Sequence, residues 1–511
     1  MVSERIIKNT GFLYLRMGIS TFILLYTTRI VLNSLGETDF GIFNIIGGVI
    51  TMLAFLNASM AAATQRYMSY YEGEGNLLKL SKIFNNSLIL HLLTALICIF
   101  AFSIAYYFIF NGILNIPQDR IHAAKIIYLS LLISTFFTII GVPYDAAINA
   151  HENMKFYAIV GIIESILKLI VAFVTVITSH DKLITYGALM AIIPLITLLL
   201  MTIYCTYYYT ECKIHIIRLW DKSIFIEITK FAGWNFLGTT SSMIGNYGIG
   251  IVLNHFHGAI LNAAQGIATQ LSGQLMAFSR NMLKAITPVI AKSEGGGNRD
   301  MMLKASLTGC KFSFFIFAFF CIPAIIEMPY ILRVWLKTVP EWAIIFSQLQ
   351  LVRTLIEQTS ITFSSSIAAE GHIKEYNKWI SVVNLMPIII IYILFSNGHS
   401  PVVMYIVNII VYGIIYSLVS LYYMNKNCGL SYRHFFVQVL SPIFLSIIAP
   451  IIIGYIPTFV MEEGIIRLCV VCILISTTYI IFTIILGLNP EEKALLSHYI
   501  HQVTTKKINI K

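Results

Sequence analysis

The chain has 511 residues, of which 58% are hydrophobic and only 11% are charged, and its formal net charge is +10. Soluble domains contain about 25% charged residues, so this composition excludes an ordinary soluble enzyme or binding domain. It indicates a polytopic membrane protein, and the positive charge is expected to meet anionic lipid rather than nucleic acid.

Apolar runs long enough to cross a bilayer, about 20 residues each, follow one another along the whole chain. The first run carries Arg16 and is longer than the core of a signal peptide, so it is predicted to be a membrane helix. We therefore predict an all-α polytopic membrane protein of about fourteen transmembrane helices. The predicted spans are 11–32, 41–64, 83–110, 125–147, 156–178, 183–209, 231–254, 259–290, 304–328, 342–368, 379–396, 401–424, 436–459 and 464–487.

Three local patterns in the first half of the chain return in the second half at nearly one offset. They are Ile30–Asn33 with Ile251–Asn254, Glu72–Asn76 with Glu294–Asn298, and Ala150, Lys155 and Tyr157 with Ala369, Lys374 and Tyr376. This recurrence predicts a duplication into two parallel six-helix lobes plus two carboxy-terminal helices. The predicted boundaries are 1–220 for the N-lobe, 221–427 for the C-lobe, 428–488 for the last two helices and 489–511 for a cytoplasmic tail.

Lysine and arginine fall mostly in the loops on one side of the predicted helices. Roughly 21 lie on the amino-terminal side and about 6 on the other, which predicts that both termini are cytoplasmic. The chain has no Gly-x-x-x-x-Gly-Lys-Ser/Thr phosphate loop, and the glycine clusters at 73–75 and 295–297 are interpreted as turns. No cofactor and no metal site are predicted.

Charged side chains inside the predicted helices are the candidate substrate-binding residues. A charge near the bilayer centre costs roughly 2.5 to 3.5 kcal/mol, so such residues usually face a cavity or a partner. The pairs Glu164 with Lys168 and Arg353 with Glu357 are four residues apart and share a helix face; they are either structural ion pairs or, through their acids, coupling sites. The predicted cationic cavity comprises Arg16, Arg280, Lys284, Arg353 and Lys168.

Polar stripes at helical spacing run along three of the predicted helices. A water-filled cavity and interhelical hydrogen bonds in a packed bundle both explain such stripes. A cavity with surplus arginine favours an anion, because the guanidinium group matches phosphate oxygens in a bidentate way. The stripes are Asn235, Thr239, Ser242 and Asn246; Gln270, Gln274 and Asn281; and Gln350, Arg353, Glu357, Ser360 and Ser364.

Over nearly its whole length the chain resembles the polysaccharide and O-antigen flippases of the multidrug/oligosaccharidyl-lipid/polysaccharide (MOP) exporter superfamily. The resemblance rests on three stretches, Tyr26–Gly36, Asp39–Asn44 and Ala63–Arg66. It implies a fold of twelve helices plus two in the bacterial inner membrane, and it implies transport of an undecaprenyl-pyrophosphate-linked sugar unit to the outer leaflet by alternating access. The glycan would be used in lipopolysaccharide, capsule or exopolysaccharide synthesis, with polysaccharide polymerase or assembly proteins as partners. By helix, Arg16 and Arg280 correspond to functional cavity arginines of the related lipid II flippase.

Two other function classes compete with this interpretation. A Na⁺- or H⁺-coupled multidrug exporter of the same superfamily would need an acidic residue deep in the amino-terminal lobe, where Glu164 is the only candidate and stands beside Lys168. A membrane glycosyltransferase, polymerase or ligase usually presents sizeable outer loops, whereas the loops here are short. We therefore expect a transporter rather than an enzyme.

Overall fold

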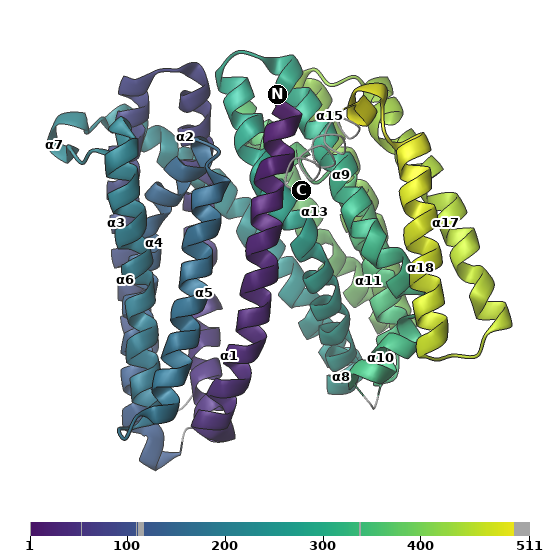
Figure 1. Ribbon diagram of the computed structural model, residues 1–511, viewed down its shortest axis with the longest axis horizontal. Helices are drawn as coiled ribbons and strands as arrows, with labels where there is room; N and C mark the ends of the chain where they lie inside the picture. The colour runs from purple at the N-terminus through teal and green to yellow at the C-terminus, as the bar shows by residue number, and fades with distance from the viewer. Residues whose placement is uncertain (1, 53, 109, 111–116, 337–338, 495–511) are drawn as a thin grey trace, which may run out of the picture. The chain divides into compact units, whose positions relative to one another are not determined.

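The computed structural model describes residues 2–52, 54–108, 110, 117–336 and 339–494. Within these residues the chain is helical and contains no β-strand (Figure 1). This confirms the predicted all-α class. Backbone groups in hydrocarbon must be satisfied internally, and a helix does this within one segment.

Eighteen α-helices are found in the described part of the chain. They are α1 (Val2–Met52), α2 (Ala54–Glu74), α3 (Leu77–Phe108), α4 (Ile121–Ala150), α5 (Met154–Ile177), α6 (Lys182–Tyr208), α7 (Ile216–Leu219), α8 (Lys222–Gly295), α9 (Arg299–Ile326), α10 (Met328–Leu336), α11 (Ala343–Gln358), α12 (Phe363–Glu370), α13 (Ile373–Ser396), α14 (Val402–Asn408), α15 (Tyr416–Cys428), α16 (Tyr432–Phe435), α17 (Ser441–Val460) and α18 (Ile465–Phe482). Short 3₁₀ segments lie at Gln118–Arg120 and Thr210–Cys212, and π-helical turns at Ile409–Ile415, Phe436–Leu440 and Thr483–Gly487.

Ten helices among the described residues are long and apolar enough to cross a membrane. The four predicted spans that are not among these ten are 41–64, 231–254, 259–290 and 342–368. The span 41–64 includes residue 53, which lies outside the described residues, and 342–368 is divided into two helices of 16 and 8 residues, each too short to cross a membrane alone. The other two spans lie in α8 and carry predicted polar stripes, which lower their mean hydropathy. The exact number of fourteen spans therefore stays a prediction.

Two pairs of predicted helices are joined without a loop, each through one glycine. Gly36 interrupts α1 with φ 77°, and Gly258 interrupts α8 with φ 81°. A positive φ is accessible to glycine at little cost, so the chain turns sharply there and continues as helix. The loop glycines Gly75 and Gly297 also match, with φ 72° and 71°. Both pairs have the same separation along the chain, so the backbone repeats where the sequence does.

The predicted helix at 342–368 is broken into α11 and α12. Hydroxyl side chains in the break bind carbonyl groups or neighbours: Thr359 Oγ1 donates to Ile356 O at 2.7 Å, and Thr362 Oγ1 donates to Ser306 O at 2.8 Å. Side chains of this kind compete with helical hydrogen bonding, which explains a break that apolar periodicity does not reveal.

The chain forms two compact units. The amino-terminal unit comprises Lys8–Thr239 and Ala291–Asn298, and the carboxy-terminal unit comprises Met1–Ile7, Thr240–Ile290 and Arg299–Lys511. The predicted lobe boundaries stay predictions.

Each unit has its own apolar core. In the amino-terminal unit, α3, α4, α5 and α6 run side by side (Figure 1), and the buried Tyr128 hydroxyl donates to Phe102 O at 2.7 Å. In the carboxy-terminal unit, the core includes Phe317 of α9 and the rings of Phe346 and Tyr405, whose centroids are 4.7 Å apart.

Candidate functional site

Arg16 lies against α5. Its Cζ atom is 4.5 Å from the ring centroid of Tyr157, a cation–π distance, and its side chain crosses the backbone of Gly161. The structure describes no hydrogen bond or ion pair of Arg16 with another described residue. No described residue therefore engages the five guanidinium N–H donors of Arg16, which suit an anion.

Three hydrogen bonds hold α1 beside α5 and the residues that directly precede α5. Asn9 Nδ2 donates to Glu152 O at 3.0 Å, Ser165 Oγ donates to Ser20 Oγ at 2.8 Å, and Ser34 Oγ donates to Thr175 O at 3.2 Å. The residue numbers rise together on both helices, so α1 and α5 run in the same direction. Arg16 is thus held between anchored points of its own helix.

Both predicted i,i+4 ion pairs form. Lys168 Nζ is 2.6 Å from Glu164 Oε1 on α5, and Arg353 Nε donates to Glu357 Oε1 at 2.7 Å on α11. The Arg353 guanidinium also lies 4.4 Å from the ring centroid of Tyr412. Lys168 and Arg353 therefore carry compensated charge, unlike Arg16.

The first polar stripe of α8 is partly satisfied within its own helix. Thr239 Oγ1 donates to Asn235 O at 2.9 Å and accepts from Ser59 Oγ at 3.4 Å, while Asn246 Nδ2 donates to Ser242 O at 2.9 Å. Ser242 is half-buried and Asn246 is exposed. The stripe therefore has capacity left for water or a ligand at Asn246.

The second stripe of α8 lies on the face opposite to its packed side. Gln270 and Gln274 are exposed, and so is Arg280, which lies farther along α8 outside this stripe. The packed face holds Ser272, which bonds Thr354 at 2.9 Å. A helix that buries one face and exposes the other is amphipathic, so this stripe does not serve packing inside the carboxy-terminal unit.

Asn281, the third member of this stripe, is half-buried, and so is Lys284, which extends the stripe. Asn281 Nδ2 donates to Ala277 O at 3.1 Å, and Lys284 is engaged with a neighbouring group. For Arg280, as for Arg16, no ion pair is found within the described ranges. The uncompensated positive charge among the predicted site residues therefore rests on Arg16 and Arg280.

The stripe predicted over 342–368 is divided by the helix break. Ser360 is 4% exposed and donates to Ser417 Oγ at 2.8 Å, whereas Gln350 and Ser364 are half-buried. At Ser360 the interhelical hydrogen-bonding interpretation is correct.

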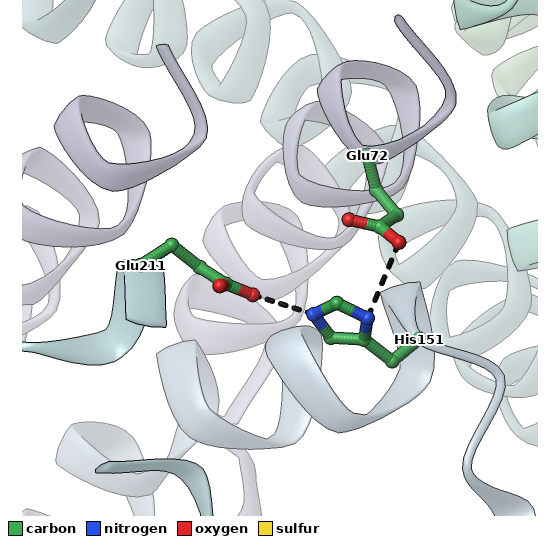
Figure 2. A group of neighbouring side chains, drawn as sticks. All are labelled: Glu72, His151 and Glu211. Atoms are coloured by element: carbon green, nitrogen blue, oxygen red, sulfur yellow. Dashed lines mark hydrogen bonds and ion pairs between the residues drawn. The ribbon is translucent and has the colours of Figure 1, made fainter. Parts of the chain in front are cut away.

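The structure brings together a charged cluster that sequence reasoning missed. Figure 2 shows His151, which follows α4, between Glu72 of α2 and Glu211. The Nδ1 atom is 3.2 Å from Glu72 Oε1, and Nε2 is 2.5 Å from Glu211 Oε1. Lys292 Nζ lies 3.3 Å from Glu72 Oε1 and 4.0 Å from Glu152 Oε1. The only sequence signal was the position of Glu72 and Lys292 in or beside the repeated glycine loops.

Glu72, His151 and Glu211 could hold a metal ion, since their possible ligand atoms lie within 4.8 Å of one another. A doubly hydrogen-bonded imidazolium fits the geometry better, because both ring nitrogens already meet carboxylates and Lys292 supplies a second positive charge. Burial alone would lower the pKa of His151, but the hydrogen bonds to Glu211 and Glu72 outweigh it and raise this pKa to about 9. The hydrogen bond from His151 in turn lowers the pKa of Glu72.

A close backbone approach places Lys292 beside Glu72. A Cβ atom on Gly73 would lie 1.9 Å from Lys292 O, and one on Gly295 would lie 1.8 Å from Tyr70 O. Both contacts require glycine. The two contacts are equivalent under the repeat. Gly295 follows Gly73 by the same number of residues as Lys292 follows Tyr70, and this is the offset of the repeated glycine loops.

The structure also contains two buried ion pairs that the sequence does not predict. Lys311 Nζ lies 2.6 Å from Glu492 Oε2, and Arg467 donates two hydrogen bonds to the Glu327 carboxylate at 2.9 and 3.0 Å. Lys311 and Glu327 are 2% and 0% exposed, so both depend on these partners. The partners are 181 and 140 residues away, beyond any local pattern.

Comparisons with known proteins agree with the fold. A family model described as polysaccharide biosynthesis protein matches residues 6–294. No curated protein sequence matches the chain.

Among solved structures, the chain is similar to a MATE transporter in the bent conformation, with 13% identity and a TM-score of 0.73. It is also similar to a multidrug resistance MATE family transporter of the MOP superfamily in an outward-facing conformation, with 14% identity and a TM-score of 0.71. A third is a MOP superfamily transporter from Pyrococcus furiosus, with 15% identity and a TM-score of 0.68. Each alignment covers 84% of this chain and 96% of the other. The family resemblance inferred from the sequence is confirmed: the chain belongs to the polysaccharide biosynthesis protein family, and its fold is similar to that of MATE transporters.

Proposed function

We propose that the protein is a flippase that carries undecaprenyl-pyrophosphate-linked oligosaccharide repeat units across the bacterial inner membrane by alternating access. The observation that carries this proposal is Arg16, a helix-borne guanidinium with no compensating carboxylate among the described residues. Family membership supports a substrate from polysaccharide biosynthesis. A pyrophosphate group supplies the oxygens that a free guanidinium binds best.

Arg280 supports the same proposal from the carboxy-terminal unit. It is exposed on α8, as are Gln270 and Gln274. In this proposal Arg16 and Arg280 bind phosphate, while the amide and hydroxyl groups of α8, including Asn235 and Asn246, bind sugar hydroxyls. The compensated pairs Glu164–Lys168 and Arg353–Glu357 have a structural role or take part in coupling.

The proposed setting follows from the chain's charge distribution and family. Both termini lie in the cytoplasm, the glycan is an O-antigen, capsule or exopolysaccharide unit, and polymerase or assembly proteins receive it. No cofactor takes part.

A cation-coupled multidrug exporter is the second candidate, because solved structures with this fold include a multidrug resistance MATE transporter. Such a protein would need an unpaired acid within the membrane. The described segment Lys8–Gly36 contains no acidic residue. Glu164 and Glu357 each form an ion pair, with Lys168 and Arg353.

Reconstituted vesicles test the proposal. Arg16→Ala should reduce flipping of a fluorescent undecaprenyl-pyrophosphate oligosaccharide by about 10- to 100-fold, which corresponds to the loss of one hydrogen-bonded charge, and Arg16→Lys should retain part of it. Lys168→Ala, which removes a compensated cation of the same unit, is the matched control and should have a smaller effect. A wild-type rate of flipping in both the Arg16→Ala and the Arg280→Ala variants would contradict the anion site. Cation-driven drug efflux by the wild-type protein would favour the multidrug exporter.

A further inference from the structure

We propose that Tyr157 and Gly161 are positioning residues that hold the Arg16 guanidinium in place to bind the phosphate groups of the substrate. This inference rests on the proposed function and identifies what orients its central arginine. The two residues are one helical turn apart on α5, so they form one continuous surface under the Arg16 side chain.

Gly161 leaves the space in which the arginine lies. A Cβ atom at this position would be 1.9 Å from Arg16 Nε, 2.4 Å from Cζ and 2.8 Å from Cδ. These distances are far inside van der Waals contact, so any other residue at 161 displaces the guanidinium. Tyr157 supplies an aromatic ring 4.5 Å from Cζ.

Stacking on an aromatic ring orients an arginine without consuming its hydrogen bonds. The cation–π contact uses the face of the guanidinium, whereas the N–H donors lie in its plane and point outward. A guanidinium already held in one orientation loses less conformational entropy when it binds a phosphate. The arrangement is therefore a preorganised anion site rather than a structural ion pair.

The second repeat lacks this arrangement. Position 16 corresponds to Leu237 at the offset that relates Ile30 to Ile251, and to Gly238 at the offset that relates Gly36 to Gly258. Likewise, Gly161 corresponds to Ile380 at the offset that relates Tyr157 to Tyr376. Tyr376 instead bonds Ser420 at 3.2 Å. At these positions the first repeat combines a cation on one helix with a glycine and a stacking ring on the other, and the second repeat does not. The duplicated fold therefore does not itself require this combination.

The position of α1 does not depend on Gly161. The hydrogen bonds of Asn9, Ser20 and Ser34 hold α1 along α5 on both sides of Arg16. The three heavy atoms nearest to the added methyl group of Gly161→Ala all belong to the flexible Arg16 side chain, so we expect the substitution to move the guanidinium and leave the helices in place. The substitution therefore separates positioning from folding.

The test is binding of undecaprenyl pyrophosphate, compared with uncharged undecaprenol, to the purified full-length protein. Gly161→Ala should weaken binding of the pyrophosphate about tenfold, with undecaprenol affinity, protein abundance and thermal stability unchanged. Tyr157→Leu should act in the same direction, and Tyr157→Phe should restore most of the affinity because it keeps the ring. Gly187→Ala is the matched control, since its Cβ would lie 2.0 Å from Ile127 Cδ1 and so also displaces only a side-chain end.

A double variant distinguishes this inference from the proposed function. In an Arg16→Ala background, Gly161→Ala should produce no further loss of pyrophosphate affinity. A further loss, or equal weakening for undecaprenol, would assign Gly161 to packing and overturn the inference. Unchanged pyrophosphate affinity in Gly161→Ala alongside a loss in Arg16→Ala would also overturn it while leaving the proposed function intact. Unchanged affinity in Arg16→Ala itself would refute the anion site first.

Discussion

At the scale of single residues, charge compensation separates the cations of this protein. His151, Lys168, Lys311 and Arg353 each lie within hydrogen-bonding distance of a carboxylate, whereas Arg16 is stacked on a ring. A buried charge without a partner is costly, so an ion pair is sufficient reason for each compensated cation to be present. Arg16 has no such ion pair among the described residues, and the proposed function therefore depends on it.

His151 provides a prediction about pH. Its pKa is about 9 in the folded protein and near 6.5 when unfolded, so folding favours the protonated ring. The resulting stability, on the order of 3 kcal/mol, is fully present below pH 6.5 and is lost as pH rises through about 9. The groups that face the ring are Glu72 and Glu211, with the Tyr209 ring stacked at 4.0 Å and Lys292 and Glu152 next to them.

Thermal unfolding in detergent between pH 6 and pH 10 checks this prediction. His151→Gln should unfold at a lower temperature than the wild type at pH 6, and the difference should shrink above pH 9. A difference that is constant across this range would show that the ring acts by packing rather than by charge. Chelators should have no effect on the wild type if the cluster holds a proton rather than a metal.

At the scale of elements, the duplication is visible in backbone conformation as well as in sequence. Gly36 and Gly258 adopt similar positive φ angles of 77° and 81°, and the third repeated pattern carries another positive-φ pair, Glu152 with φ 55° and Gly371 with φ 109°. A side chain at positive φ is strained, so Glu152 marks a place where the fold demands this conformation even without glycine. The helix-joining geometry is thus part of what was duplicated.

The junction of α9 with the segment after α18 offers a second prediction. Glu492 binds the buried Lys311, and Asn489 and Glu492 cap each other through hydrogen bonds of 2.8 Å. Glu492→Gln leaves a buried lysine without its counter-charge and should destabilise the protein by about 3 to 5 kcal/mol. Lys311→Met combined with Glu492→Gln should recover most of this loss, because no buried charge remains.

Urea or thermal unfolding of the purified variants measures this effect. Glu491→Gln is the matched control, since its partner Lys304 is exposed, and we expect a change below about 1 kcal/mol. A double variant as unstable as Glu492→Gln alone would mean that the carboxylate acts through the cap at Asn489 instead.

At the scale of the whole molecule, the excess of basic residues on one side predicts the orientation in the membrane. Single cysteines at Asp119 and Asn397 should react with an impermeant thiol reagent in intact cells, whereas cysteines at Leu78 and Arg218 should not. All four positions are exposed, and none is a glycine with positive φ, where a cysteine would be strained. Cys469 and Cys472, which are exposed and half-buried, must first be replaced. Reaction at Leu78 and Arg218 but not at Asp119 and Asn397 would show the opposite orientation in the membrane.

The sequence by itself determined the helical class, the family and the repeat, because apolar runs, charge asymmetry and echoed motifs are local properties of the chain. It also determined the pairs Glu164–Lys168 and Arg353–Glu357, since residues four apart lie about one helical turn from each other.

Only the tertiary structure decided which charges are compensated over long distances. The partners of His151, Lys311 and Glu327 lie 60 to 181 residues away, and local spacing carries no information about them. The same holds for Gly161, whose importance is the absence of a Cβ atom beside Arg16, a residue of a helix far earlier in the chain. Such a contact exists only once two helices lie side by side.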